Sequence, residues 1–324
     1  MTSRGSRLLI GVLLCAACAP VSGAGAVGPP LPTSATGRAG AVAPGGSERF
    51  LALRAGQDTL VKVVRRGDGR ALRSRRIGGP WTIPAVTIEG GTTGVSADGG
   101  TLALIRPERS FPPDDTLLAV LDARRLLVRR TISLPGFFTI DAISPDGSWL
   151  YLIQYAGQDP LDYRVRALDA RTGRLAAGDI VDPRNPGERM AGLPLTRTMS
   201  RGGRWVYTLY GGGGEMFIHA LDTVGRSAAC IDLDTLPTQG DLSGYRLTVS
   251  AGGHRIDVRR QGGVVATVAA PKAAVSEPGA ALAGPRTAPA PQDGGDFPWW
   301  ALLPVAGVCV LVAGAVAGRV SWRI

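Results

Sequence analysis

The sequence predicts an all-β domain built from a repeated unit of four short strands, followed by one C-terminal transmembrane helix. Three observations support this prediction. Gly (46 residues) and Pro (24 residues) are abundant while only 19% of the residues are charged, a composition typical of proteins with many short strands and turns. A turn-and-strand motif recurs at intervals of roughly 50 residues. Finally, residues 298–318 contain no charged side chain.

The recurring motif is a serine-led turn followed by a run of β-prone residues. It occurs at residues 96–104, 144–152, 200–208 and 250–258, with a degenerate copy at 44–53. An Asp-Gly or Gly-Gly pair occupies the turn, which is the signature of a hairpin between two strands. The two Asp-Gly copies are Asp98-Gly99 and Asp146-Gly147.

A second repeated element follows each of the three middle turns by about 25 residues. There Asp122, Asp169 and Asp222 each end an apolar strand, and the chain then reverses direction. An aspartate at such a place accepts hydrogen bonds from the amides of the turn that it opens. Because the three recur at the same kind of turn, they are predicted to be structural and not catalytic.

Each period therefore contains four antiparallel strands, and a sheet of four strands cannot bury both of its faces alone. Repetition of such units predicts a β-propeller over residues 44–270. Five blades are favoured, with the first and last sets of strands joined into one. A ring of six with degenerate blades and an incomplete propeller that needs a partner both stay open.

Residues 144–152 also match the Ser-Pro-Asp-Gly-x-x-Leu-Tyr motif. In this respect the chain resembles bacterial exported propellers of the YVTN, lactonase and TolB-like kinds, with WD40-like repeats. The stretches at 205–210, 217–223 and 230–233 are similar to an uncharacterised actinobacterial group of membrane-anchored propeller-like proteins. The resemblance implies the fold. Lactonase-like propellers hold a metal in the channel, but no such ligand set can be assigned here.

The N-terminus reads as an export signal. Residues 1–26 combine Arg4 and Arg7 with an apolar stretch and a small-x-small site at 24–26. Cleavage before Cys18, which would leave a lipidated cysteine, is the alternative. Residues 27–43 are rich in Gly, Pro and Ala and are expected to be disordered.

The C-terminus reads as a membrane anchor. The Pro-rich segment 271–297 is predicted to be an extended linker, 298–318 a transmembrane helix and 319–324 a cytoplasmic tail. Two arginines in the tail orient the protein as type I, with its ectodomain extracellular. Gly314 and Gly318 fit a small-xxx-small contact, so a helix–helix dimer is possible.

Few residues of the sequence are candidates for catalysis or metal binding. The only histidines are His219, in an apolar run, and His254, in a repeat turn, while Cys230 is the single cysteine of the ectodomain. His219 and Cys230 are interpreted as buried structural residues and His254 as exposed. No catalytic, zinc-binding or nucleotide-binding motif is present, so no catalytic residue, metal or cofactor is predicted. Nothing in the pattern points to nucleic acid.

Two features remain as candidate binding sites. When the repeats are aligned on the serine, Asp141 and Arg197 fall at one level on the innermost strands of adjacent blades. They form either a polar ligand site or a structural ion pair. Arginine runs at 65–76 and 124–130 mark the outer hairpins of two blades. These runs either bind acidic lipid or polymer, or form solvated outer strands.

The favoured function is therefore a membrane-anchored propeller at the cell surface that binds or scaffolds an envelope protein or polymer. The alternatives are a lactonase-like hydrolase or lyase and a ligand-binding sensor. Scarce histidine argues against the first alternative, and the short tail argues against the second.

Overall fold

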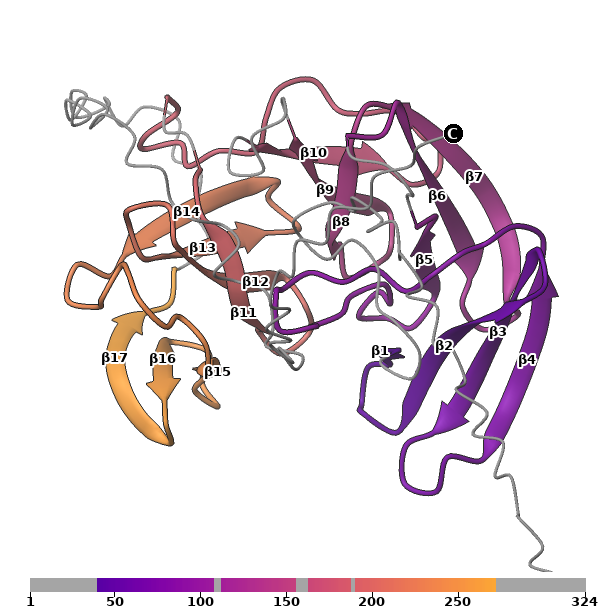
Figure 1. Ribbon diagram of the computed structural model, residues 1–324, viewed down its shortest axis with the longest axis horizontal. Helices are drawn as coiled ribbons and strands as arrows, with labels where there is room; N and C mark the ends of the chain where they lie inside the picture. Colours follow the sequence, from indigo (N-terminus) through magenta and orange to yellow (C-terminus); the bar gives the residue numbers. More distant parts are fainter. Residues whose placement is uncertain (1–39, 108–111, 156–162, 188–189, 272–324) are drawn as a thin grey trace, which may run out of the picture. The chain divides into compact units, whose positions relative to one another are not determined.

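The computed structural model describes residues 40–107, 112–155, 163–187 and 190–271. These residues form strands β1 to β17 in five antiparallel sheets and contain no helix (Figure 1). None of the described segments is a helix that could cross a membrane. The predicted signal peptide, linker beyond Pro271, transmembrane helix, tail and Gly314–Gly318 contact lie outside the described residues.

The first two sheets come from the N-terminal part of the chain. The first sheet, in the order β1-β2-β3-β4, contains β1 (Ala41–Val42), β2 (Glu48–Ala55), β3 (Asp58–Arg65) and β4 (Ala71–Ile77). The second, in the order β5-β6-β7, contains β5 (Thr101–Ile105), β6 (Asp115–Asp122) and β7 (Leu127–Pro135).

Three further sheets follow in the same manner. The third contains β8 (Phe138–Ile143), β9 (Trp149–Tyr155) and β10 (Tyr163–Asp169). The fourth contains β11 (Leu193–Met199), β12 (Trp205–Gly211), β13 (Phe217–Asp222) and β14 (Ser227–Asp232). The fifth contains β15 (Tyr245–Val249), β16 (Arg255–Arg260) and β17 (Gly263–Ala269).

Within each sheet, every strand pairs with the next one along the chain, and each sheet is complete before the next begins. This repeated meander is the blade topology of a β-propeller. The prediction of an all-β fold of the propeller type is therefore confirmed. Isolated bridges extend two of the three-stranded sheets. Val95 pairs with Leu102 before β5, and Leu175 pairs with Leu168 after β10.

Two details differ from the sequence prediction. Strand β1 lies inside segment 27–43, which was expected to be disordered, because Ala41 pairs with Phe50 and is 2% exposed. In the described part of the chain, no sheet combines strands from both ends, since the first sheet uses β1 as its own fourth strand. The number of blades stays a prediction.

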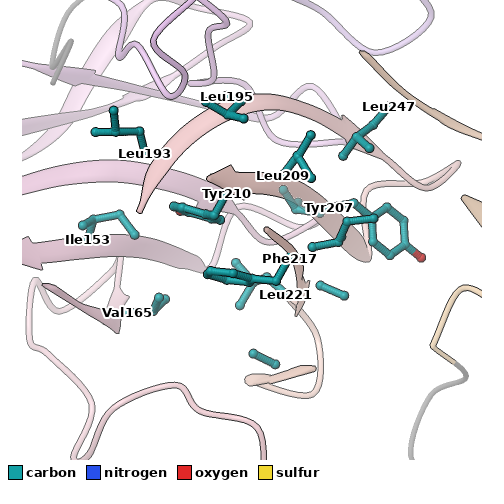
Figure 2. Packing of buried hydrophobic residues seen from close by; sticks show 14 of the residues in the cluster. Ile153, Val165, Leu193, Leu195, Tyr207, Leu209, Tyr210, Phe217, Leu221 and Leu247 are labelled. Carbon is teal, nitrogen blue, oxygen red and sulfur yellow. The ribbon is translucent and has the colours of Figure 1, made fainter. Parts of the chain in front are cut away.

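The core lies between successive sheets, because both faces of each inner strand are covered. All five residues of β5 and all six of β13 are buried, whereas the outer strands β4, β7 and β17 are largely exposed. Figure 2 shows the largest cluster, in which the rings of Tyr210 and Phe217 stack with centroids 5.3 Å apart. That pair lies within the fourth sheet, and the Tyr210 ring also packs on Tyr163 of the third sheet, with centroids 5.9 Å apart. Contacts of the second kind hold neighbouring sheets face to face.

Candidate functional site

Asp141 and Arg197 meet between the third and fourth sheets. Asp141 lies on β8 and Arg197 on β11. The Arg197 guanidinium Nη1 lies 3.5 Å from the Asp141 carboxylate and donates a 2.6 Å hydrogen bond to the Asp141 carbonyl oxygen. Their side chains are 10% and 5% exposed. The pair therefore joins two sheets through a largely buried ionic contact.

A local irregularity places Asp141 in this position. The register of β8 against β9 shifts between Ile140 and Ala142, so that Asp141 has no partner residue on β9. An extra residue of this kind is a β-bulge, which redirects a side chain and interrupts the ladder of hydrogen bonds. The bulge thereby leaves the Asp141 carbonyl oxygen to accept from the neighbouring sheet.

Asp141 also lines a small cavity. The cavity has a volume of about 20 Å³, enough for about one water molecule. Its polar lining includes Thr139, Tyr155, Tyr163 and Tyr210. Burial raises the pKa of all three tyrosines well above the usual value, so their hydroxyls stay protonated. The cavity therefore combines hydroxyl groups with one carboxylate.

A row of polar residues crosses the fourth sheet from Arg197. The strand registers pair Arg197 with Thr208, Thr208 with His219 and His219 with Cys230. His219 is 2% exposed, and burial lowers its pKa below the usual 6.5. Two buried nitrogens, Arg197 Nη2 and His219 Nε2, have no hydrogen-bond partner among the described residues. Unsatisfied buried donors and acceptors of this kind are rare, and often face a water or ligand.

The three aspartates that end apolar strands all serve their turns. Asp122 accepts from the amides of Arg124 and Arg125, and Asp169 from the amides of Arg171 and Thr172. The turn amides are the main cause that lowers the pKa of both carboxyls. Both side chains are therefore ionised hydrogen-bond acceptors of the backbone at neutral pH.

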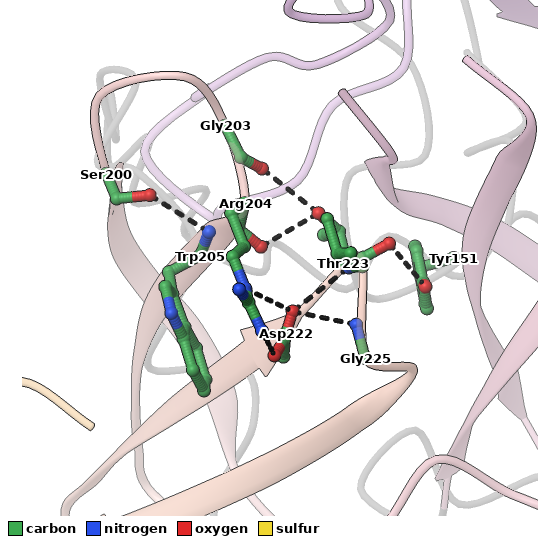
Figure 3. Close-up of polar contacts among 9 residues, drawn as sticks. Tyr151, Ser200, Gly203, Arg204, Trp205, Asp222, Thr223 and Gly225 are labelled. Carbon is green, nitrogen blue, oxygen red and sulfur yellow. Dashed lines mark hydrogen bonds and ion pairs between the residues drawn. The ribbon is translucent and has the colours of Figure 1, made fainter. Parts of the chain in front are cut away.

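Asp222 is the most enclosed member of this group. Its side chain is 4% exposed and accepts from the amides of Val224 and Gly225 and from the Arg204 guanidinium (Figure 3). Burial alone would raise the pKa of Asp222, but these hydrogen bonds outweigh it and the pKa is lowered. The sequence analysis identified Asp222 but not its partner Arg204, because nothing in the repeat pattern marks Arg204 as a contact of that aspartate.

In the serine turns, too, side chains accept hydrogen bonds from backbone amides. Asp98 accepts from the Gly100 amide and Asp146 from the Ser148 amide. Gly99 and Gly147 adopt positive φ angles of 66° and 72°, which glycine tolerates best. The serines have a role that the sequence analysis did not assign, although their recurrence signals it. Their hydroxyls accept from the first amide of the next strand in four turns: Ser96, Ser144, Ser200 and Ser250.

The remaining candidates are scattered. His254 is exposed, and Cys230 is partly exposed rather than fully buried as expected. The sequence analysis did not place Tyr155, Tyr163 and Tyr210 at one cavity: the first two pair across β9 and β10, but no local pattern links Tyr210 to them. In the described ranges, no three His, Cys, Asp or Glu side chains are grouped as metal ligands.

No family model matches the chain, and no curated protein matches it. Several solved structures do. The β-propeller domain of Cps50 (Swd1) from Myceliophteria thermophila is 10% identical, with a TM-score of 0.44, over 76% of this chain and 70% of that one. A putative TolB from Agrobacterium tumefaciens is 17% identical, with a TM-score of 0.38, over 71% and 70%.

An oligogalacturonate lyase in complex with manganese is 12% identical, with a TM-score of 0.42, over 70% of this chain and 59% of that one. Similarity of this degree is distant. It concerns the arrangement of strands, and no activity follows from it.

Proposed function

We propose that the chain is an exported β-propeller held on the outer face of a membrane by a C-terminal helix, where it binds or scaffolds an envelope protein or polymer. The uncharged stretch at 298–318, with Trp299 and Trp300 near its start and Arg319 directly after it, supports the anchor. The five meander sheets supply a rigid platform for binding.

One observation carries the binding role. Arg197 has one guanidinium nitrogen committed to Asp141, while Nη2 is buried with no partner in the described part of the chain. An acceptor atom from a partner, such as a carboxylate or carbonyl oxygen, would satisfy this nitrogen. Asp141 would position the guanidinium, and the cavity that Asp141 lines has room for about one water-sized atom.

The test begins with membranes that contain the full chain. We expect the chain to stay with the membranes through an alkaline wash, because a transmembrane helix resists extraction, and to carry a partner after solubilisation in detergent. Arg197→Gln removes the charge and should release the partner. Arg54→Gln is the matched control, since Arg54 is exposed and donates only to the Gly56 carbonyl among the described residues.

Thermal unfolding of each variant shows whether it is folded. A partner retained by folded Arg197→Gln would contradict the proposed site, and release of the chain by the alkaline wash would contradict the anchor. Recovery of a stoichiometric metal ion or small molecule instead of a macromolecule would favour the hydrolase alternative.

A further inference from the structure

The turns at one end of the strands lie side by side in every sheet. Within each sheet, the amide just past the end of one strand donates to a carbonyl of the serine turn or its equivalent. In the first sheet the Arg66 amide donates to Ser47 (2.8 Å), and in the fourth the Thr223 amide donates to Arg204 (2.8 Å). Figure 3 shows the Arg204 carbonyl also accepting from the Thr223 hydroxyl. The second and third sheets have the same bond, from Ala123 to Gly100 and from Ala170 to Ser148.

These paired turns belong to one side of the domain. The Asp98 amide donates to the Pro145 carbonyl, which joins the serine turns of the second and third sheets. The Tyr151 hydroxyl on β9 donates to the Thr223 carbonyl in the fourth sheet. We call this surface the turn face. It comprises residues 43–47, 65–70, 96–100, 122–126, 144–148, 169–174, 200–204, 222–226 and 250–254 and the strand residues next to them.

The turn face carries positive charge that its own aspartates do not neutralise. The nine ranges that define it hold ten arginines and six aspartates, which leaves four positive charges after every aspartate is counted. Eight arginines of this face are exposed and have no carboxylate partner among the described residues: Arg66, Arg70, Arg124, Arg125, Arg171, Arg174, Arg201 and Arg226. They come from four successive sheets, so the charge is spread over the face.

Exposed apolar side chains gather on the same face. Large hydrophobic side chains with more than a third of their surface exposed are few in the described ranges, and six of them adjoin these turns: Val42 (44%), Leu72 (38%), Leu127 (43%), Val128 (43%), Met199 (58%) and Val224 (57%). Arginines interspersed with exposed apolar groups suit an interface that is anionic at its surface and apolar just below.

The chain also leaves the described domain at this face. The Ala270 amide donates a 2.9 Å hydrogen bond to the carbonyl of His254, in the serine turn of the fifth sheet. The described residues end one position later, at Pro271. The segment that leads to the proposed membrane helix at 298–318 therefore starts from the turn face.

We propose that the turn face rests on an anionic lipid bilayer, so that the anchored propeller lies against the membrane. The proposal builds on the proposed membrane anchor, and adds an orientation and a lipid class to it. Arginine guanidinium groups would bind lipid phosphates, and the exposed valine, leucine and methionine side chains would enter the headgroup boundary. A hydrophilic polyanion would match the charge of the face but would gain nothing from its apolar groups.

Hydrogen exchange of the full chain in nanodiscs tests this orientation. Discs of phosphatidylcholine alone are compared with discs that also contain phosphatidylglycerol. We expect amides of the turns at 123–126, 170–174 and 223–226 to exchange severalfold more slowly with phosphatidylglycerol. The turns at the opposite ends of the strands, at 56–57 and 261–262, should exchange equally in both and serve as the internal control.

Two charge-matched variants sharpen the experiment. Arg124→Glu with Arg171→Glu reverses two exposed charges of the turn face and should abolish the lipid-dependent protection. Arg54→Glu with Arg259→Glu makes the same change near the opposite turns and should preserve it. High salt should weaken the protection in the wild type, because exposed charges are screened.

The outcomes separate the orientation from the anchor. A chain that inserts into neither kind of disc would refute the proposed anchor. Insertion into both, with equal exchange of the turn amides, would leave the anchor standing and overturn the lipid-bound face. Equal protection by soluble polyphosphate in discs of phosphatidylcholine alone would assign the face to a polyanion and overturn the lipid proposal.

Discussion

At the scale of single residues, the repeated polar side chains act on the backbone. Asp122, Asp169 and Asp222 accept amide hydrogen bonds at their turns, and the serines of the repeat accept from the strand that follows. Tight turns leave amide groups without strand partners, and unpaired amides are costly when water is excluded. The recurrence of these residue types therefore reflects the needs of the turns.

A matched pair of variants can test whether the serine turn requires glycine. Gly147 and Gly99 share a positive φ, but an added Cβ at Gly147 would lie 2.5 Å from Thr101 Cβ, whereas at Gly99 it would meet nothing within 4 Å. Left-handed backbone alone costs an alanine about 1–2 kcal/mol. We predict that Gly147→Ala lowers the unfolding midpoint clearly more than Gly99→Ala, as measured by thermal denaturation. Equal shifts would show that the neighbouring sheet adjusts freely.

The buried His219 predicts a pH dependence of stability. Burial lowers its pKa below the usual 6.5, so the unfolded chain binds more protons in the interval between the two values. The contribution of neutral His219 to the free energy of unfolding is fully present above about pH 6.5. It is lost as the pH falls toward the pKa of His219 in the folded chain. Arg197 opposes protonation, while Asp141 and Asp182 favour it.

We predict that His219→Gln flattens the loss of stability between pH 6.5 and lower values, because the variant has no imidazole to protonate. Unfolding midpoints over this range provide the measurement. His254→Gln, which removes an exposed imidazole, is the matched control. An unaltered profile in His219→Gln would mean that another group titrates.

At the scale of elements, the bulge in β8 connects the third and fourth sheets. It lets Asp141 offer both its carboxylate and its carbonyl oxygen to Arg197 on β11. β8 is an edge strand of its sheet, so a residue without a partner on β9 can use its carbonyl toward the neighbouring sheet. The first strands of both sheets depart from regular pairing near the candidate site, since β11 also has a register shift between Pro194 and Thr196.

A double-mutant cycle measures what this contact contributes. Removal of one partner from a buried ion pair typically costs about 3–5 kcal/mol because the other charge is left buried. We predict that Asp141→Asn and Arg197→Met each lower the free energy of unfolding strongly, and that the double variant loses clearly less than the sum of the two. Strict additivity in urea denaturation would show that the two side chains do not interact.

At the scale of the whole molecule, the repeat produces a two-sided domain. The order of strands within each sheet places the serine and aspartate turns at one end, where neighbouring sheets bring their arginines together. The chain leaves the domain at that same end, beside His254. Charge, exposed apolar surface and chain exit therefore coincide on the turn face, and the proposed lipid contact depends on this coincidence.

The local pattern alone determined the all-β class, the repeated meander and the structural role expected of the turn aspartates. These features depend on residues within a few positions of one another, such as Asp146 and Gly147, so the chain encodes them locally. Segment 27–43 shows the limit of such local patterns. Two residues of β1 carry too little pattern to mark a strand, and only their pairing with β2 defines it.

The tertiary structure decided the rest. Aligning the repeats put Asp141 and Arg197 at one level, but only the packing of two sheets showed the bulge, the 3.5 Å contact and the cavity beside it. Two tyrosines of that cavity, Tyr155 and Tyr163, pair across β9 and β10, but Tyr210 comes from β12 of the next sheet, and no local pattern signals that it joins them. A repeat specifies how each sheet folds, whereas a site between sheets depends on side chains that are distant in sequence and that only packing brings together.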